Sequence, residues 1–412
     1  MAINSARIQK TLADLAQFGA VAGGGTTRLS YSSEFLAAQK YLQQAMLAAG
    51  MMVERDAIGN LIGTYAGIDS SLPAVMSGSH LDTVPHGGNF DGVLGIVAAL
   101  EVARSWHESG YKPQRSLKVI ATIEEESTAF GQACFGVRVR SGEFKNSKVG
   151  DIKCVSQIGT LADCLKNAGL PADALQAAAV GFGDIAAFIE LHIEQGAQLD
   201  EEHCPCGIVT HIVGYERLYL TLTGEANHAG TTAMHRRRDA AAAGAEIILG
   251  VQALAKGDTR FVATCGKFDV EPDAANIVPG KVQMCIETRS YDDAVLQEVR
   301  PKLLDIIKRG TEKNGVVWQI DGDFHVPAVP LSAEMINCME TAAQEMNLQH
   351  CQLPSWAGHD AQIFASTGVP TGMIFVPSVN GISHAREEYS RPEEIASGVR
   401  LLAKVLEKLT QK

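Results

Sequence analysis

The stretch SGSHLDTVPHGGNFDG, residues 77–92, places a histidine, His80, two residues before an aspartate, Asp82. Two glycines then carry the chain to a second aspartate, Asp91. Residues two apart on an extended strand point to the same side, and an imidazole that binds a metal ion needs an acceptor at its other nitrogen. We therefore expect Asp82 to hold His80 and Asp91 to act as a metal ligand. The alternative is a polar loop that merely ends a strand.

The composition of the whole chain is ordinary for a globular protein with a substantial core. Its 412 residues are 46% hydrophobic and 20% charged, which suits two domains or one large domain with an insertion. The net charge of −12 argues against nucleic acid and anionic membranes as partners, since both attract basic surfaces. An anionic small substrate stays compatible with this charge, because a pocket can be locally positive.

The cysteines and the N-terminal residues bear on the location of the protein. Nine cysteines are scattered at irregular spacing, which fits reduced thiols better than a disulfide framework. The first residues lack the succession of segments that defines a signal peptide. No stretch reaches the roughly 20 apolar residues of a membrane-spanning helix. We therefore expect a cytoplasmic protein with no membrane partner.

Apolar runs that are typical of strands alternate with segments of helical length. The runs lie at 74–76, 117–123, 188–193 and 373–376, and residues 92–106 form a largely apolar segment of helical length. Such alternation predicts an α/β sheet, in which functional groups gather at the carboxyl ends of the strands.

The middle of the chain has a different pattern. Strand-like and helix-like segments follow one another as β-α-β-β-α, which indicates an α+β unit with an antiparallel sheet; they lie at 216–225, 239–255, 261–270, 281–289 and 292–308. We expect an inserted domain at 212–329. The flanking segments, 1–211 and 330–412, are expected to fold together as the other domain.

Three adjacent carboxylates, Glu124, Glu125 and Glu126, follow the run at 117–123. They repel one another, so the plain interpretation is a solvated acidic turn. A metal centre would offset the repulsion, with one carboxylate as ligand and its neighbour as general base.

Two further polar groups follow strand-like runs. In FIELHIEQ, residues 188–195, His192 and two glutamates face away from the isoleucines, a pattern that an exposed edge strand could also show. GISH, residues 381–384, adds His384 near the C-terminus. Imidazoles and carboxylates of this kind suit one or two divalent ions. The predicted ligand set is His80, Asp91, Glu126, His192 and His384.

The motifs SGSHxDTV, EEE, ELHIEQG, NHAGTT, NxVPG, GHDA and GISH occur in this order along essentially the whole chain. In this order they resemble the hydantoinase/carbamoylase branch of the zinc aminoacylase and carboxypeptidase superfamily. The resemblance implies a mixed-sheet, zinc-peptidase-like catalytic domain of the α/β class with an inserted α+β dimerisation domain. It also implies a homodimer with two divalent ions (zinc or manganese, with cobalt possible) that hydrolyses a ureido C–N bond and releases ammonia and CO2.

The resemblance further implies roles for individual residues. The five predicted ligands match the family's metal ligands, and Asp91 matches the ligand that bridges the two ions. Glu125 matches the general base. We count Asp82, together with Glu125 and His228, among the predicted catalytic residues. His228 matches a histidine that reaches the partner's active site and stabilises the oxyanion. The positions that bind the ureido group and the substrate carboxylate are matched by Gln195, Asn276, Arg289, Ala357 and Gly358.

The chain also departs from the family pattern. Ala129 replaces an arginine, Trp356 a glycine and Ala233 a proline, and Tyr215 stands where some members carry an amide. These departures leave the substrate side chain open. Hydrolysis of an N-acyl amino acid or dipeptide is the alternative activity. A metal-binding protein without catalysis is a third reading, against which the retained Glu125 argues.

Overall fold

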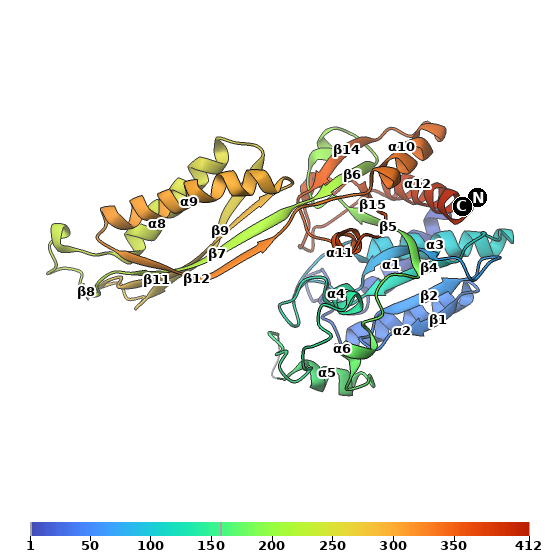
Figure 1. The fold of residues 1–412 in the computed structure, drawn as a ribbon, viewed down its shortest axis with the longest axis horizontal. Helices are drawn as coiled ribbons and strands as arrows, with labels where there is room; N and C mark the ends of the chain where they lie inside the picture. Colours follow the sequence, from blue (N-terminus) through green and yellow to red (C-terminus); the bar gives the residue numbers. More distant parts are fainter. Residues whose placement is uncertain (1, 157–158, 412) are drawn as a thin grey trace. The chain divides into compact units, whose positions relative to one another are not determined.

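The computed structural model describes residues 2–156 and 159–411 and divides into two compact units (Figure 1). The first unit comprises 1–210, 330–353 and 359–412, and the second comprises 211–329 and 354–358. The short segment 354–358 was expected in the other domain. It joins the second unit because its backbone bonds there: the carbonyl of Ser355 accepts the N–H of Val213 at 3.0 Å.

Among the described residues, nine strands form one mixed sheet in the order β1-β2-β4-β3-β5-β15-β6-β13, with β14 paired to β6. The strands are β1 (Met52–Arg55), β2 (Leu61–Tyr65), β3 (Ala74–His80), β4 (Leu117–Thr122), β5 (Ile185–Ile193), β6 (Gly207–Ile212), β13 (Val329–Pro330), β14 (Cys351–Ser355) and β15 (Thr371–Val376). The four strands β4, β3, β5 and β15 run parallel. Their carboxyl ends therefore meet at one edge of the sheet.

Helices cover both faces of this sheet. They are α1 (Ser5–Ala16), α2 (Ser33–Ala48), α3 (Val93–Ser109), α4 (Phe135–Ser141), α5 (Leu161–Asn167), α6 (Ala174–Ala177), α7 (Gln198–Glu201), α10 (Ala333–Glu345), α11 (Asp360–Ser366) and α12 (Pro392–Gln411), with a 3-10 turn η2 (Val379–Gly381). The side chains of Ile189 and Leu191 face α10 and α12. On the opposite face, Phe188 stacks on Phe364 of α11 with ring centroids 3.9 Å apart.

Both faces of β5 are therefore covered, by α10 and α12 on one side and by α11 on the other. An exposed edge strand was one interpretation of FIELHIEQ, and it is wrong: β5 lies between β3 and β15, and its residues Ala187–Ile193 are buried. The polar side chains of Glu190 and His192 share the α11 face with Phe188. The sheet therefore carries a buried polar group in its interior, where an uncompensated charge would be costly.

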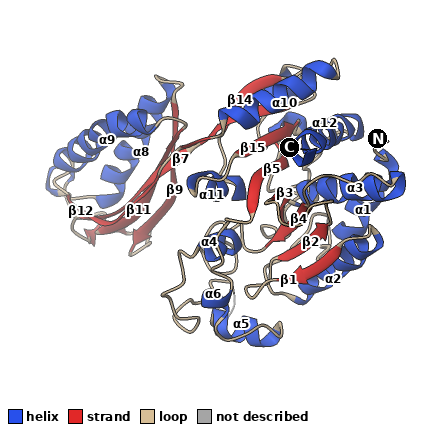
Figure 2. Cartoon of the chain, turned by 45° about the vertical axis from the view of Figure 1, so that its right-hand side comes forward, coloured by secondary structure: helices blue, strands red, loops and turns tan. Residues whose placement is uncertain are grey.

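The second unit contains a four-stranded antiparallel sheet in the order β12-β7-β11-β9, with helices α8 and α9 along one face (Figure 2). Its elements are β7 (Gly214–Thr223), β8 (Asn227–His228), η1 (Met234–Arg236), α8 (Ala240–Lys256), β9 (Phe261–Glu271), β10 (Ile277–Val278), β11 (Lys281–Ser290), α9 (Asp293–Lys313) and β12 (Val317–Val326). The predicted order β-α-β-β-α omitted β12. This edge strand has no buried residue, so its sequence lacks the alternation that marks a half-buried strand.

No helix in 2–156 or 159–411 is long and apolar enough to cross a membrane.

Helix α3 sits unusually close to the sheet. A Cβ on Gly95 would lie 2.4 Å from the carbonyl oxygen of Leu191 and 2.7 Å from the Cβ of Ser79. Glycine at this position therefore lets α3 approach β3 and β5, and Asp91 directly precedes the first turn of α3.

We predict that Gly95→Ala lowers the free energy of unfolding by about 1–3 kcal/mol, because overpacking outweighs the gain in helix propensity. Urea denaturation followed by circular dichroism measures the change. Gly183→Ala is the control, since a Cβ there meets nothing within 4 Å, and it should stay within about 0.5 kcal/mol of wild type. Equal stability of the two variants would contradict the packing argument.

Candidate metal centre

The five predicted ligands gather at the carboxyl edge of the parallel strands. His80 is the last residue of β3, and His192 is the penultimate residue of β5. Glu126 follows β4, His384 follows β15, and Asp91 lies just before α3. Residues as far apart in the sequence as His80 and His384 thus lie close together, because parallel strands end at the same edge of the sheet.

Asp91 is the centre of this arrangement. Its Oδ1 lies 3.3 Å from Nε2 of His80 and 3.1 Å from Nε2 of His192. Its Oδ2 lies 3.1 Å from Nε2 of His384, which in turn is 3.6 Å from the carboxylate of Glu126. Two groups of potential ligands, His80–Asp91–His192 and Asp91–Glu126–His384, therefore share one carboxylate.

The two buried histidines present the same nitrogen to Asp91. Nδ1 of His80 lies 2.9 Å from the carbonyl oxygen of Asp82, and Nδ1 of His192 lies 2.9 Å from that of Ile193. A carbonyl oxygen only accepts, so each Nδ1 carries a proton and Nε2 is the ligand atom. Gly92 makes room for this geometry, since a Cβ there would lie 2.4 Å from the ring of His80.

The role expected of the Asp82 carboxylate needs correction. The backbone carbonyl of Asp82, and not its side chain, bonds to His80. The two carboxylate oxygens accept the backbone N–H groups of Glu125 and Glu126, each at 3.2 Å. The sequence pattern could not reveal this. The N–H groups reach the Asp82 carboxylate only because the chain turns after β4, and this turn is not encoded in the spacing of His80 and Asp82.

The acidic triplet separates into different environments. Glu124 turns away and accepts the N–H groups of Ala129 and Phe130 at 2.8 and 2.6 Å. Glu125 has one oxygen 4.0 Å from Nε2 of His80 and the other 3.5 Å from the thiol of Cys134. Glu124 is buried and the other two side chains are only 11% and 7% exposed, so the solvated acidic turn is excluded.

The protonation equilibria of this group are strongly perturbed. Burial raises the pKa of Glu125 well above its usual value, against the opposing influence of His80. Burial and the charge of Asp91 raise the pKa of Glu126 in the same direction. Crowded carboxylates in a buried site are stabilised as anions by a bound cation. The donors, imidazole nitrogens and carboxylate oxygens, fit divalent zinc, manganese or cobalt.

A third group, Glu190, His192 and His359, has the proximity of a metal site but different chemistry. Ser79 donates its hydroxyl proton to one oxygen of Glu190 at 2.6 Å, and the N–H of Ala361 donates to the other at 3.0 Å. Each oxygen thus accepts a hydrogen bond, one from β3 and one from α11, so this glutamate links β5 to both elements.

Further side chains contact Asp91 directly or through its backbone. Gln195, predicted as a substrate contact, donates its amide N–H to Oδ2 of Asp91 at 2.9 Å. Glu388 accepts the backbone N–H groups of Phe90 and Asp91. Nothing in the sequence singled out Glu388, which reads as one of two adjacent glutamates before a helix.

Several residues of this region have a strained backbone. Five residues around the centre have positive φ angles, which residues other than glycine rarely adopt. They are Glu124, Ser127, Cys134, Gln195 and His384. Such conformations cost about 1–3 kcal/mol each and persist where the surrounding structure enforces them.

The remaining predicted site residues belong to the second unit. His228 lies in β8 and pairs with Ile277 of β10, next to the exposed Asn276. Arg289 of β11 donates to Glu287 at 2.7 Å and to the carbonyl of Trp356 at 3.1 Å. The turn that contains Ala357 and Gly358 is fixed by Ser355, whose hydroxyl bonds the backbone of Ala357.

Two of the departures from the family pattern lie beside Arg289. The ring of Tyr215 lies 6.0 Å from its guanidinium and 4.6 Å from that of Arg217. Trp356 packs edge-on against Tyr291 at 5.7 Å. In the first unit, Ala129 is buried behind the acidic turn. Ala233 precedes η1, and nothing in the structure explains its presence there.

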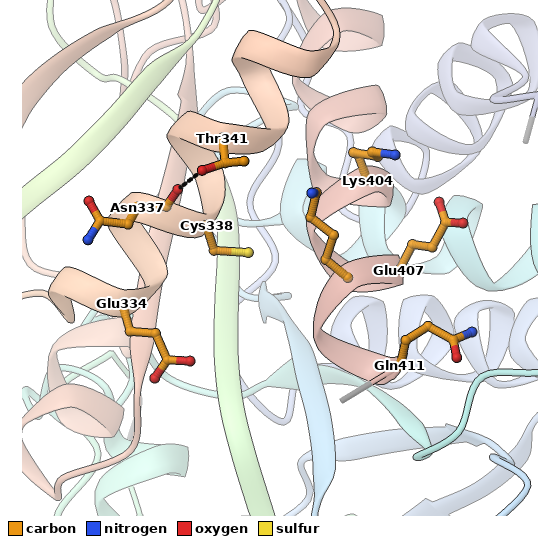
Figure 3. Close-up of a pocket in the computed structure, with 8 residues that line it drawn as sticks. Glu334, Asn337, Cys338, Thr341, Lys404, Glu407 and Gln411 are labelled. Atoms are coloured by element: carbon orange, nitrogen blue, oxygen red, sulfur yellow. Dashed lines mark hydrogen bonds between the residues drawn. The ribbon is translucent and has the colours of Figure 1, made fainter.

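A surface pocket of about 660 Å³ lies apart from these residues, along α10 and α12 (Figure 3). It is lined by Glu334, Asn337, Cys338, Thr341, Lys404, Glu407, Lys408 and Gln411. Both lysines lie near Glu345, at 3.5 and 2.6 Å, so their charge is offset locally. None of the predicted site residues lines this pocket.

Comparison with known proteins agrees with the geometry. Residues 76–408 match the model of Peptidase family M20/M25/M40. The chain is 37% identical to the N-carbamoyl-L-amino-acid amidohydrolase of Paenarthrobacter aurescens (98% of this chain, 97% of the relative). It is also 37% identical to the allantoate amidohydrolase of Escherichia coli (98% and 97%).

A solved structure extends the likeness to the fold. An amidase of the hydantoinase/carbamoylase family from Burkholderia multivorans superposes with a TM-score of 0.89 at 31% identity, covering 100% of this chain and 98% of the other. With a family model that matches most of its length and relatives that it covers almost end to end, the chain belongs to Peptidase family M20/M25/M40, a family of metal-dependent hydrolases.

Proposed function

We propose that the chain hydrolyses the ureido C–N bond of an N-carbamoyl amino acid or an allantoate-like acid, with two divalent ions per chain. The observation that carries the proposal is the position of Asp91, whose two oxygens face two different groups of ligands. The names of the relatives support the substrate class, since both named enzymes are amidohydrolases of ureido acids.

The side chains of the first unit divide the catalytic work. Divalent ions held by this ligand set would polarise the substrate carbonyl and lower the pKa of water. Glu125, whose carboxylate lies 4.0 Å from Nε2 of His80, accepts the proton of the attacking water and delivers it to the leaving nitrogen. Asp82 accepts the backbone N–H groups of both Glu125 and Glu126, which fixes the position of the base relative to the neighbouring ligand.

His228 supplies a hydrogen-bond donor to the oxyanion. Its Nδ1 accepts the backbone N–H groups of Gly230 and Thr231 at 3.0 and 3.2 Å. The neutral ring therefore carries its proton on Nε2. Because His228 is exposed, this N–H is available to a ligand from outside its own loop. Removal of one such donor costs on the order of 10²–10³ in rate.

Arg289 binds the substrate carboxylate in this proposal. Glu287 lies between Arg289 and Arg217 and bonds to both, so the three side chains together keep one positive charge. A guanidinium can hold a carboxylate through two parallel hydrogen bonds. Gln195, Asn276 and the backbone of Ala357 and Gly358 complete the proposed contacts to the ureido acid.

The same proposal includes a cytoplasmic homodimer in which the second unit forms the interface. The cysteines support a reducing location, since no disulfide joins any of the nine, all of which lie in the described ranges. The exposed loop of His228 supports a site completed by a second copy.

The substrate class is tested with a panel of allantoate, N-carbamoyl-β-alanine and N-carbamoyl-L-amino acids, assayed for ammonia with and without added Mn²⁺ or Zn²⁺. We expect ammonia release from at least one ureido acid, loss of activity after chelation and recovery with added ions. Cleavage of N-acyl amino acids or dipeptides in place of every ureido acid would favour the alternative activity.

The roles within the acidic turn predict different effects for two isosteric changes. Glu125→Gln should keep the metal content and lower kcat roughly 10²–10⁴-fold, because it removes the proton acceptor. Glu126→Gln should lower metal occupancy, because a neutral amide is a poorer ligand than a carboxylate. Metal analysis and steady-state kinetics on both variants decide the assignment. The opposite pattern would move the base to the neighbouring residue.

The shared site is tested by mixing two inactive variants, Glu125→Ala and His228→Ala, under conditions that exchange subunits. In a mixed dimer one site collects both lesions and the other collects neither. Half of the dimers are mixed after random exchange of equal amounts, and half of their sites are intact, so activity should recover to about a quarter of wild type. If exchange is demonstrated and activity stays at the level of the separate variants, His228 does not serve the partner.

A further inference from the structure

The segment that carries Asp91 is anchored by Glu388, almost 300 residues further along the chain. Oε1 of Glu388 accepts the backbone N–H of Phe90 at 2.9 Å and that of Asp91 at 3.1 Å. The ring of Tyr389, the next residue, packs edge-on against Phe90 with centroids 6.0 Å apart. The backbone on which the bridging carboxylate depends is therefore held by this second loop.

The other oxygen of Glu388 holds the loop of His384. Oε2 accepts the hydroxyl proton of Ser383, the residue before His384, at 2.9 Å. The same hydroxyl oxygen lies 3.4 Å from Oδ2 of Asp91. One carboxylate thus joins the two loops whose side chains, Asp91 and His384, face each other at 3.1 Å.

The packing around Glu388 shows that its position is tightly defined. Glu388 is only 5% exposed. A Cβ on Gly88 would lie 2.0 Å from its Oε1 and 2.1 Å from its carboxyl carbon. Glycine at this position is what allows the carboxylate to lie over the loop, which accounts for one of the two glycines between His86 and Asn89.

We propose that Glu388 is a positioning residue that sets the spacing of Asp91 Oδ2 and His384, and with it the affinity of the ion held by Asp91, Glu126 and His384. This inference rests on the proposed two-ion function. Loss of the acceptor also frees the hydroxyl proton of Ser383 for Asp91 Oδ2, where it competes with the ion.

The effect falls on one ion more than on the other. His80 and His192 sit on strands of the central sheet, and each is oriented by a backbone carbonyl close to it. His384 lies beyond β15 in a loop, with a positive φ and a side chain that is 49% exposed. Its position relative to Asp91 therefore depends on contacts within and between loops. Glu388 makes two hydrogen bonds to the loop of Asp91 and one within the loop of His384.

The test compares three variants of the full-length protein. Glu388→Gln keeps the shape of the side chain, but only one of its two terminal atoms, the amide oxygen, can accept a hydrogen bond. Gly88→Ala displaces the carboxylate of Glu388 without changing its charge. Glu387→Gln is the matched control, since Glu387 is an exposed neighbour paired with Arg386. Each chelator-treated protein is titrated with Zn²⁺ by calorimetry, and circular dichroism with the metal-free melting temperature reports folding.

We expect wild type and Glu387→Gln to bind two ions per chain alike. In Glu388→Gln and Gly88→Ala one ion should bind roughly 10–100-fold more weakly, the usual effect of losing a support of a metal ligand. It should be the same ion that Glu126→Gln weakens, and the metal-free melting temperature of Glu388→Gln should stay near that of wild type.

Other outcomes overturn the inference or its foundation separately. Unchanged binding of both ions in Glu388→Gln and Gly88→Ala refutes the role of Glu388 while the two-ion function stands. Equal weakening of both ions, or the same loss in Glu387→Gln, shows general loosening and also refutes it. A folded wild-type protein that binds fewer than two ions refutes the proposed two-ion function itself.

Discussion

The carboxylate of Asp91, whose two oxygens face two groups of potential ligands, makes the interactions on which the arrangement depends. Its two oxygens are shared by three imidazoles, each within 3.3 Å, so a small displacement of Asp91 disturbs both groups of ligands at once. Several independent features fix it in place. Gly95 lets α3 lie against the sheet, Gly92 leaves room for the ring of His80, and Glu388 binds the backbone. The position at the start of α3 also favours a negative charge, because the helix dipole is positive there.

The parallel sheet explains why such a centre can form and what it costs. Parallel strands deliver several polar and acidic residues to one edge of the sheet. Burial then raises the pKa of Glu125 and Glu126, and the carboxylates repel one another. A bound cation offsets the negative charge of these carboxylates. Burial of the apolar faces of β5 and α3 also lowers the free energy of the folded state, which offsets the cost of the strained turns.

The sequence predicted the parts of this structure that follow from local patterns. The central strands and α3 were predicted because apolar runs end in polar residues. Four of the five predicted ligands lie at or beyond the ends of such runs, and Asp91 was added because two glycines carry the chain back toward His80. Contacts made by the backbone could not be read in this way. The Asp82 carboxylate binds N–H groups of the turn after β4, and Glu388 binds N–H groups beside Asp91, and both depend on loop conformations that side-chain patterns do not encode. Strand β12 was missed because it has no buried residue to mark it.

Under the proposed function, residues of the second unit select the substrate while the metal centre stays constant. Arg217, Glu287 and Arg289 lie on neighbouring strands, and Glu287 cancels one of the two positive charges. One net positive charge remains beside the ring of Tyr215 and the backbone carbonyl of Trp356, two residues that depart from the family pattern. The charge suits any substrate with a carboxylate, whereas the rings limit the shape of what lies next to it. Under the proposed function, exchange of these rings would therefore alter the preferred ureido acid without disturbing Asp91, because no residue of this group belongs to the unit that holds it.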